Sequence, residues 1–186
     1  PELCGAEGDM VKRCINLEDK KKFLNLMQGY EKTANFFDTT IADNPSFGNI
    51  ADGLITDAIK STGAAKKGGR APIVSVCDYA EPMPDSGLSL VCTPGNDVDA
   101  VTGLVAAGCN VVIFSTGLGT PTGNPIVPVL KISTNSTIAR RLSDMIDFDC
   151  GPVIDGTPLE DVSRELFEKV IETASKDYVV KADKLE

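Results

Sequence analysis

The residues best suited to bind a ligand lie in a glycine-rich loop between two apolar segments. Glycine allows positive φ and close backbone approach, so neighbouring amide N–H groups can converge on an anion. The spacing fits neither the dinucleotide fingerprint nor a Walker phosphate-binding loop. We therefore expect the loop to hold a carboxylate or another anion through its glycines and hydroxyls, namely Thr116, Gly117, Gly119, Thr120, Thr122 and Gly123.

A second loop, residues 38–49, carries three neutral hydrogen-bonding side chains within six residues: Asn44, Ser46 and Asn49. They stand at the start of a helix predicted over 50–66, and a helix N-terminus favours anions. The turn-forming residues of this loop would also explain an ordinary surface turn, so both interpretations stay open. We predict that the loop over 43–49 and the loop over 115–123 face each other across a cleft at one sheet edge.

Lys131 is a further candidate because it lies inside the apolar segment 127–132. An unpaired ammonium is costly in such surroundings. Its side chain must therefore either extend to the end of the sheet or meet a carboxylate, from the protein or from a ligand.

Helices and short apolar strands must position these loops. Residues 81–87, between the first two strands, are too few for a helical crossover, which favours a hairpin or a long bend. Asn16, Ser136 and Thr157 are the expected N-caps, with Pro158 at the first helical position. Helices are predicted over 6–14, 17–37, 50–66, 97–108, 136–145 and 157–175; strands over 72–77, 87–92, 111–114 and 127–132; an extended segment over 147–154; and a frayed tail over 176–186.

This order of elements predicts one α/β domain over residues 1–186, with a layered, Rossmann-like, mostly parallel sheet covered by helices. A net charge of −9 argues against a nucleic-acid partner. No apolar run reaches membrane-spanning length, so we expect no membrane partner. The six cysteines form no C-x-x-C pair, which favours reduced thiols in a cytoplasmic protein. The absence of histidine excludes Ser-His and Cys-His catalytic units and His-ligated metals within this chain.

Several motifs occur along the chain in a fixed order. They are Pro1-Glu2-Leu-Cys-Gly5-Ala6-Glu7, Asn44-Pro45-Ser46-x-Gly48-Asn49, Lys60-Ser61, Lys67-Gly68-Gly69, Thr93-Pro94-Gly95, and Thr116-Gly117-x-Gly119-Thr-x-Thr-Gly123 leading to Pro128-x-x-Lys131. Together they resemble the C-terminal domain of the altronate and galactarate dehydratases, and the related large subunit of sulfolactate sulfo-lyase. Two departures from the family pattern are the Ala58-Ile59 pair before Lys60, where acidic residues are common, and Cys92 before Thr93, where an aspartate is common.

The resemblance implies a metal-dependent lyase that removes water from a sugar acid and leaves a 2-keto-3-deoxy acid. Iron, or manganese, is the implied cofactor, with its ligands largely outside this chain. The implied substrate is a small hydroxy acid, bound by Asn44, Ser46, Asn49, Lys131 and the glycine-rich loop. Lys60 becomes a candidate base or charge stabiliser, and Glu2 and Glu7 become candidates for base or metal ligand.

The resemblance further implies that this is the C-terminal part of a longer enzyme. Its partners would be the N-terminal domains or a small subunit, and it leaves open whether the chain forms a homo-oligomer. The alternative functions are a sulfolactate sulfo-lyase large-subunit domain and a non-catalytic assembly or ligand-binding domain of the same fold.

Overall fold

The computed structural model describes residues 2–51, 53–84 and 86–184. Pro1 of the first motif, Asp52 of the predicted helix 50–66, Asp85 of the predicted bend and the last two residues of the tail lie outside the described residues. The chain divides into two compact parts, Pro1–Ala107 and Gly108–Glu186. The loop over 43–49 belongs to the first part and the loop over 115–123 to the second, so their facing each other stays a prediction. The single domain also stays a prediction.

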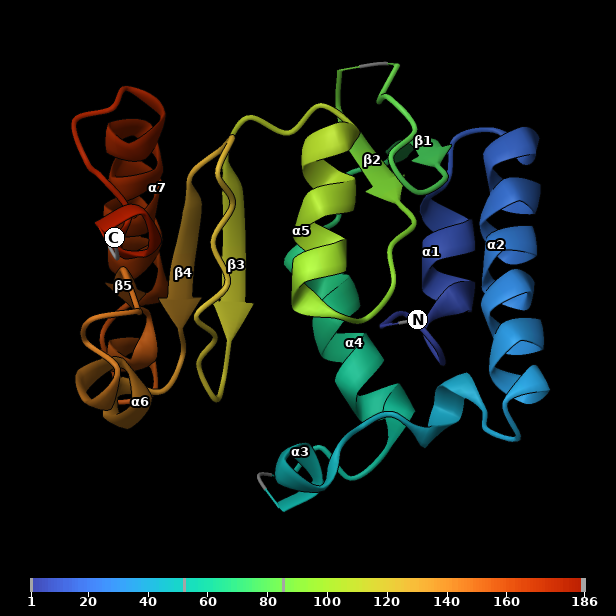
Figure 1. Ribbon diagram of the computed structural model, residues 1–186, viewed down its shortest axis with the longest axis horizontal. Helices are drawn as coiled ribbons and strands as arrows, with labels where there is room; N and C mark the ends of the chain where they lie inside the picture. Colours follow the sequence, from blue (N-terminus) through green and yellow to red (C-terminus); the bar gives the residue numbers. More distant parts are fainter. Residues whose placement is uncertain (1, 52, 85, 185–186) are drawn as a thin grey trace. The chain divides into compact units, whose positions relative to one another are not determined.

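The first part combines a two-stranded sheet with helices (Figure 1). Its hydrophobic core joins α1 and α2 to the first strand through Met10, Phe23, Met27, Ile73 and Val76. The elements are α1 (Glu7–Arg13), α2 (Leu17–Phe36), η1 (Ile41–Asp43), α3 (Phe47–Ala51), α4 (Asp57–Lys67), β1 (Ile73–Cys77), β2 (Leu88–Val91) and α5 (Asp97–Ala106).

The two strands of this sheet are parallel, with Ile73 opposite Leu88 and Cys77 opposite Val91. A hairpin between them is therefore wrong, and the segment 78–87 is the long bend. Ten extended residues reach roughly 33 Å, which is enough to run back along a five-residue strand without a helix. The carboxyl ends of β1 and β2 consequently lie at the same edge.

The single helix predicted over 50–66 is also wrong, because α3 and α4 are separate. Gly53 has φ +98°, a conformation that interrupts the helix. Thr56 then begins α4 as its N-cap, its hydroxyl accepting from the Ile59 N–H at 3.2 Å. A threonine followed by an aspartate is an ordinary helix-start signal, so the break could have been found in the sequence.

The second part contains a three-stranded sheet in the order β3-β4-β5, with both strand pairs parallel. Thr116 pairs with Ser133, and Ser133 pairs with Asp149, so all three strands end at one edge. At this edge, β3 leads into the glycine-rich loop, β4 into Thr134, and β5 into the turn that contains Gly151. The elements are β3 (Val112–Thr116), β4 (Val129–Ser133), α6 (Ser136–Arg141), β5 (Phe148–Asp149), η2 (Gly151–Val153), α7 (Leu159–Ala174) and η3 (Lys181–Lys184).

Two predicted caps in this part are wrong. Asn135, rather than Ser136, caps α6, because its side chain accepts from the N–H groups of Thr137 and Ile138. α7 begins one residue after Pro158, and no side chain caps it, so Thr157 is not an N-cap.

The tail is not frayed over residues 176–184. Val180 is fully buried, and Asp147 accepts hydrogen bonds from the Tyr178 hydroxyl at 2.9 Å and the Lys181 N–H at 2.8 Å. The charged composition of the tail gave no sign of the buried Val180 or of the hydrogen bonds to Asp147. Asp147 thus ties the end of the described chain to the sheet.

Parallel strands covered by helices confirm the α/β layered fold. Among the described residues, no helix combines the length and apolar character that crossing a membrane requires.

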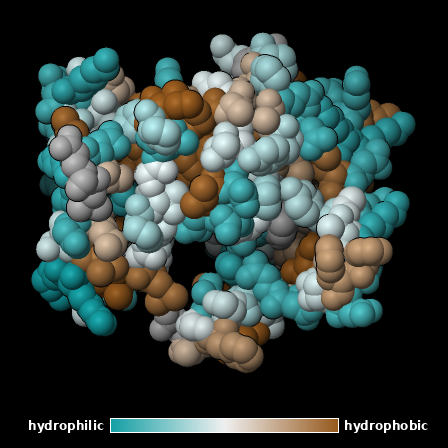
Figure 2. All heavy atoms as spheres, viewed as in Figure 1, coloured by the Kyte–Doolittle hydropathy of each residue, from teal (hydrophilic) through white to brown (hydrophobic). Residues whose placement is uncertain are grey.

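The surface carries apolar side chains around α3 (Figure 2), where Phe47 is 94% exposed. Phe36, Phe37 and Ile55 are exposed in the same stretch of chain.

Candidate active site

Three of the predicted site residues come together in the first part. The Lys60 ammonium lies 3.2 Å from the Glu2 carboxylate and donates a 2.7 Å hydrogen bond to the Asn44 carbonyl oxygen. The Asn44 amide in turn donates to Glu2 at 2.9 Å. Each side chain thus contacts the other two, and the group presents a cation, an anion and a neutral amide within one hydrogen-bonded cluster.

Close backbone approach places Glu2 beside α4. Gly5 has φ +90°, and a Cβ there would lie 3.1 Å from the Ala58 Cα, so glycine lets the first turn pack directly on the helix. Lys60 follows Ala58 by two residues on α4. Asn44 enters from the preceding loop, next to the buried Pro45, and the peptide bond between these two residues is cis.

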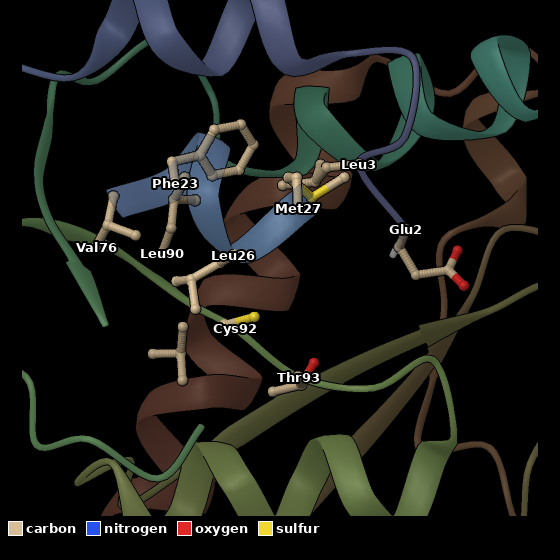
Figure 3. Close-up of a pocket in the computed structure, with 10 residues that line it drawn as sticks. Glu2, Leu3, Phe23, Leu26, Met27, Val76, Leu90, Cys92 and Thr93 are labelled. Carbon is tan, nitrogen blue, oxygen red and sulfur yellow. The ribbon is translucent and has the colours of Figure 1, made fainter. Parts of the chain in front are cut away.

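The cluster lies at the carboxyl end of β2, where α/β sheets place ligands. Glu2 and Thr93 border one end of a cavity of about 120 Å³. Gly95 lies so close that a Cβ on it would be 3.2 Å from the Glu2 carboxylate. Figure 3 shows the carboxylate of Glu2 at one side of this cavity and apolar side chains at the other; the remaining lining residues are Leu3, Phe23, Leu26, Met27, Val76, Leu90, Val91 and Cys92.

The cavity wall holds a neutral thiol. Burial raises the pKa of Cys92, and the side-chain hydrogen bond with Tyr30 opposes this shift. A thiol with a raised pKa is a poor nucleophile at neutral pH. Cys92 therefore contributes to the apolar lining rather than supplying a reactive group.

Lys67 is a residue that the sequence reasoning did not single out for the site. It follows Lys60 by two helical turns, which puts both on the same face of α4. Burial is the main cause of its lowered pKa; Glu2 opposes that shift and Lys60 adds to it. The seven-residue spacing between the two lysines was the signal available in the sequence.

Three other predicted residues, Ser46, Asn49 and Glu7, form hydrogen bonds with neighbours in the chain rather than with this cluster. Asn49 donates to the Ser46 hydroxyl at 2.9 Å, a local bond within α3 and its start. Glu7 accepts from the Gly5 N–H at 2.9 Å, which places its carboxylate at the start of α1. Their roles toward a substrate stay predictions.

The glycine-rich loop has an open end and a packed end. Gly117 is exposed, and a Cβ built there would meet no atom within 4 Å. Gly119 has φ +94°, and a Cβ there would lie 2.2 Å from Leu142 Cδ1. A Cβ on Gly123 would lie 2.9 Å from Ala182. The last two glycines are thus needed for packing, whatever the loop binds.

The threonine hydroxyls of the loop serve its internal structure. Thr116 accepts from the Gly119 N–H at 2.9 Å. Thr120 and Thr122 are buried, and their hydroxyls lie 2.9 Å apart. These contacts fix the shape of the loop, and direct binding of a substrate by the threonines stays a prediction.

Lys131 neither extends to the solvent nor pairs with a carboxylate among the described residues, and pairing with a ligand carboxylate stays a prediction. The residue is only 1% exposed, and its ammonium donates to the Thr122 carbonyl oxygen at 3.1 Å. Burial lowers the pKa of Lys131, while Asp147 and Asp183 act in the opposite direction. The side chain supports the glycine-rich loop from beneath.

The described residues do not fit an iron site. In residues 2–51, 53–84 and 86–184, no group of three or more Cys, Asp or Glu side chains is arranged to hold a metal ion, and the chain has no histidine. Glu2 is the carboxylate of the cluster and is paired with Lys60.

Comparison with known proteins agrees with the motifs. The family described as "D-galactarate/Altronate dehydratase, C-terminal" matches residues 1–186. Altronate dehydratase of Escherichia coli (strain K12) is 37% identical over 175 residues, covering 94% of this chain and 35% of the relative. Altronate dehydratase of Bacillus subtilis (strain 168) is 37% identical over 180 residues, covering 96% and 36%.

A further relative, (2R)-sulfolactate sulfo-lyase subunit beta of Chromohalobacter salexigens, is 31% identical over 178 residues, covering 94% of this chain and 46% of the relative. The chain spans about a third of the length of the altronate dehydratases that it matches. With its whole length matched, the chain belongs to the family of the D-galactarate/altronate dehydratase C-terminal domain.

Proposed function

We propose that this chain is a domain of a hydro-lyase that dehydrates a sugar acid of the altronate or galactarate type to a 2-keto-3-deoxy acid. The observation that carries the proposal is the Glu2–Asn44–Lys60 cluster at the carboxyl end of β2. Its members come from three separate motifs of the family, and the fold makes them one hydrogen-bonded unit. The similarity to altronate dehydratases supports the choice of substrate.

The chemistry requires a base, a cation and a hydroxyl-binding group. A base removes the proton next to the substrate carboxylate, the C–O bond of the β-hydroxyl breaks, and the leaving hydroxide departs as water after protonation. The enol that remains converts to the 2-keto acid. A cation stabilises the negative charge that develops on the carboxylate when the proton leaves.

The three side chains suit these roles. The Lys60 ammonium already lies 3.2 Å from one carboxylate, that of Glu2, so we assign Lys60 to binding and stabilising the substrate carboxylate. Glu2 becomes available as the proton acceptor when the substrate anion takes over its pairing with Lys60. Asn44, which can both donate and accept, binds a substrate hydroxyl.

We further propose that other parts of the enzyme complete the site. The altronate dehydratases extend well beyond the aligned region, because the chain covers only 35–36% of them. Upstream domains or a small subunit would then supply the ligands for iron or manganese, whose Lewis acidity would assist departure of the hydroxide. In this proposal the chain contributes substrate binding and the initial proton transfer.

The test is Lys60→Met in the enzyme that contains this domain, with altronate and galactarate as substrates. We expect kcat/KM to fall about 100-fold or more, since the loss of one stabilising donor costs that much in other enzymes. Lys66→Met is the matched control, because Lys66 is an exposed lysine on the same helix, and it should change kcat/KM less than twofold. Equal effects of the two substitutions would refute the assigned role.

The sulfo-lyase relative provides the second candidate function. Elimination of sulfite from sulfolactate needs the same proton transfer and the same carboxylate binding, with a different leaving group. Assaying sulfolactate beside the two sugar acids distinguishes the candidates. Sulfite release without dehydration of either sugar acid would replace the proposed function with this one.

A further inference from the structure

The second part of the chain contains a polar cavity that the Glu2–Asn44–Lys60 cluster does not use. Its volume is about 390 Å³, within the range of small-molecule sites. It lies at the edge where β4 and β5 end, the position at which α/β sheets bind ligands. The lining residues are Thr134, Asn135, Ser136, Thr137, Arg140, Gly151, Ile154 and Asp155.

The wall after β4 is held by a network of local bonds. Ser133 Oγ accepts from the Asn135 N–H at 3.1 Å, and Asn135 Oδ1 accepts from the Thr137 and Ile138 N–H groups at 3.0 and 3.3 Å. Asn135 is therefore committed to capping α6. The hydroxyls of Ser136 and Thr137 border the cavity on a fixed backbone.

The floor of the cavity requires glycine. A Cβ on Gly151 would lie 2.2 Å from Ser136 Oγ, 2.6 Å from the Ser136 nitrogen and 2.8 Å from Asp149 Oδ1. The Gly151 N–H donates to Asp149 Oδ1 at 2.8 Å, which fixes the turn after β5. The loops after two neighbouring strands thus approach more closely than any side chain would permit.

The charged residues of the lining indicate the class of ligand. Arg140 donates to the Thr137 hydroxyl at 3.4 Å, which uses one of the five N–H donors of its guanidinium. A planar guanidinium matches a carboxylate in a two-bond geometry. Asp155 is the lining carboxylate, and it would repel a second carboxylate but accept a hydrogen bond from a hydroxyl.

We propose that this cavity is a binding site for a hydroxycarboxylate anion. Arg140 binds the carboxylate, Ser136 and Thr137 donate to it or to an adjacent hydroxyl, and Asp155 accepts from a hydroxyl further along the ligand. The choice of a sugar acid as the natural ligand rests on the proposed function. The cavity and its charges do not depend on that function.

The test is calorimetric titration of the 186-residue chain with galactarate as the probe. We expect Arg140→Gln to raise the Kd at least tenfold. Arg141→Gln is the matched control, because it removes the same charge from the neighbouring position, which is not part of the lining, and it should change the Kd less than twofold. Equal effects of the two substitutions, or no binding of galactarate to the unaltered chain, would overturn the proposal.

A second set of titrations separates the roles of the charged groups. Galactitol, which has the hydroxyls without the carboxylates, should bind at least tenfold more weakly than galactarate. Succinate has carboxylates but no hydroxyls, so Asp155→Asn should weaken the binding of galactarate and should not weaken that of succinate, which loses only a repelling charge. Equal effects of Asp155→Asn on both acids would show that Asp155 does not contact a hydroxyl and would contradict the assigned orientation.

Failure of this inference differs from failure of the proposed function. Galactarate binding that depends on Arg140, in an enzyme that dehydrates no sugar acid, would support the site and refute the hydro-lyase assignment. Dehydration that is sensitive to Lys60→Met, with galactarate binding unaffected by Arg140→Gln, would support the hydro-lyase assignment and refute the Arg140 site.

Discussion

Replacing Lys131 with methionine tests whether this lysine acts on a ligand or on the loop above it. The Lys131 ammonium donates to the Thr122 carbonyl oxygen at 3.1 Å, and the residue is 1% exposed. Methionine has nearly the same length and keeps the apolar stem packed within the strand. The substitution therefore removes the charge and one hydrogen bond, and little else.

Two opposing effects set the size of the change. Loss of a hydrogen bond from a charged donor costs about 1.5–3 kcal/mol. Removing a buried ammonium relieves a desolvation penalty of about the same size or larger. We therefore expect the free energy of unfolding at pH 7 to stay within about 1 kcal/mol of the unaltered chain. Lys131→Ala also loses three buried methylenes, worth about 0.8 kcal/mol each, and should destabilise clearly.

The pH dependence gives the sharper readout. Burial lowers the pKa of Lys131 below its ordinary value of 10.5, so between the folded and unfolded values the unfolded chain binds more protons. The stability supplied by this group therefore rises with pH in that window, by at most about 1.4 kcal/mol per pH unit. Lys131→Met abolishes the rise, and subtracting the two curves cancels the titration of all other groups.

Urea denaturation of both proteins at intervals from pH 7 to pH 10 measures this difference. The unaltered chain should gain stability relative to Lys131→Met as the pH increases. A difference that stays constant across the range would refute the claim that Lys131 is buried as a charged group.

Three further predictions concern the loop, the tail and metal binding. Gly117→Ala should change the free energy of unfolding by less than about 0.5 kcal/mol, whereas Gly119→Ala should cost more than about 1 kcal/mol, because only Gly119 combines positive φ with contact at Leu142; thermal melts of both variants compare them. Tyr178→Phe should cost about 1 kcal/mol through the lost hydrogen bond to Asp147, measured by urea denaturation. Iron titration of the chain should give a Kd above the micromolar range, since its described residues hold no suitable ligand cluster; submicromolar binding would contradict this.

Some helix starts and stops governed by local chemistry could be predicted, although two of the three expected N-caps, Ser136 and Thr157, are wrong. Asn16 caps α2 as expected, accepting from the Asp19 N–H at 2.8 Å. The predicted helix end at residue 66 is correct to within one residue, because α4 ends at Lys67, with Gly68 as its C-cap and Gly69 at φ +60°. These features depend on a few neighbouring residues, and the sequence contains all of them.

The direction of strand pairing could not be predicted in the same way. The segment 78–87 has the length of either a hairpin connection or an extended return, and sequence spacing does not distinguish them. The contact that guides it is distant in the chain, because Met83 N–H donates to the Ala107 carbonyl at 3.0 Å, at the end of α5. Tertiary contacts of this kind override local rules on loop length.

At the candidate site, the sequence indicated which residues form the loop but not which way their side chains point. Glycines and hydroxyls revealed the loop after β3, but residue type alone does not say which side chains turn inward. Thr120 and Thr122, two positions apart, are both buried, and the Lys131 ammonium donates a hydrogen bond to the Thr122 carbonyl oxygen. Gly117, the one loop glycine whose added Cβ would meet nothing, is therefore the position where a backbone N–H could approach a ligand without disturbing the fold. A larger side chain at Gly117 tests the loop as a binding element, whereas the same change at Gly119 tests its packing.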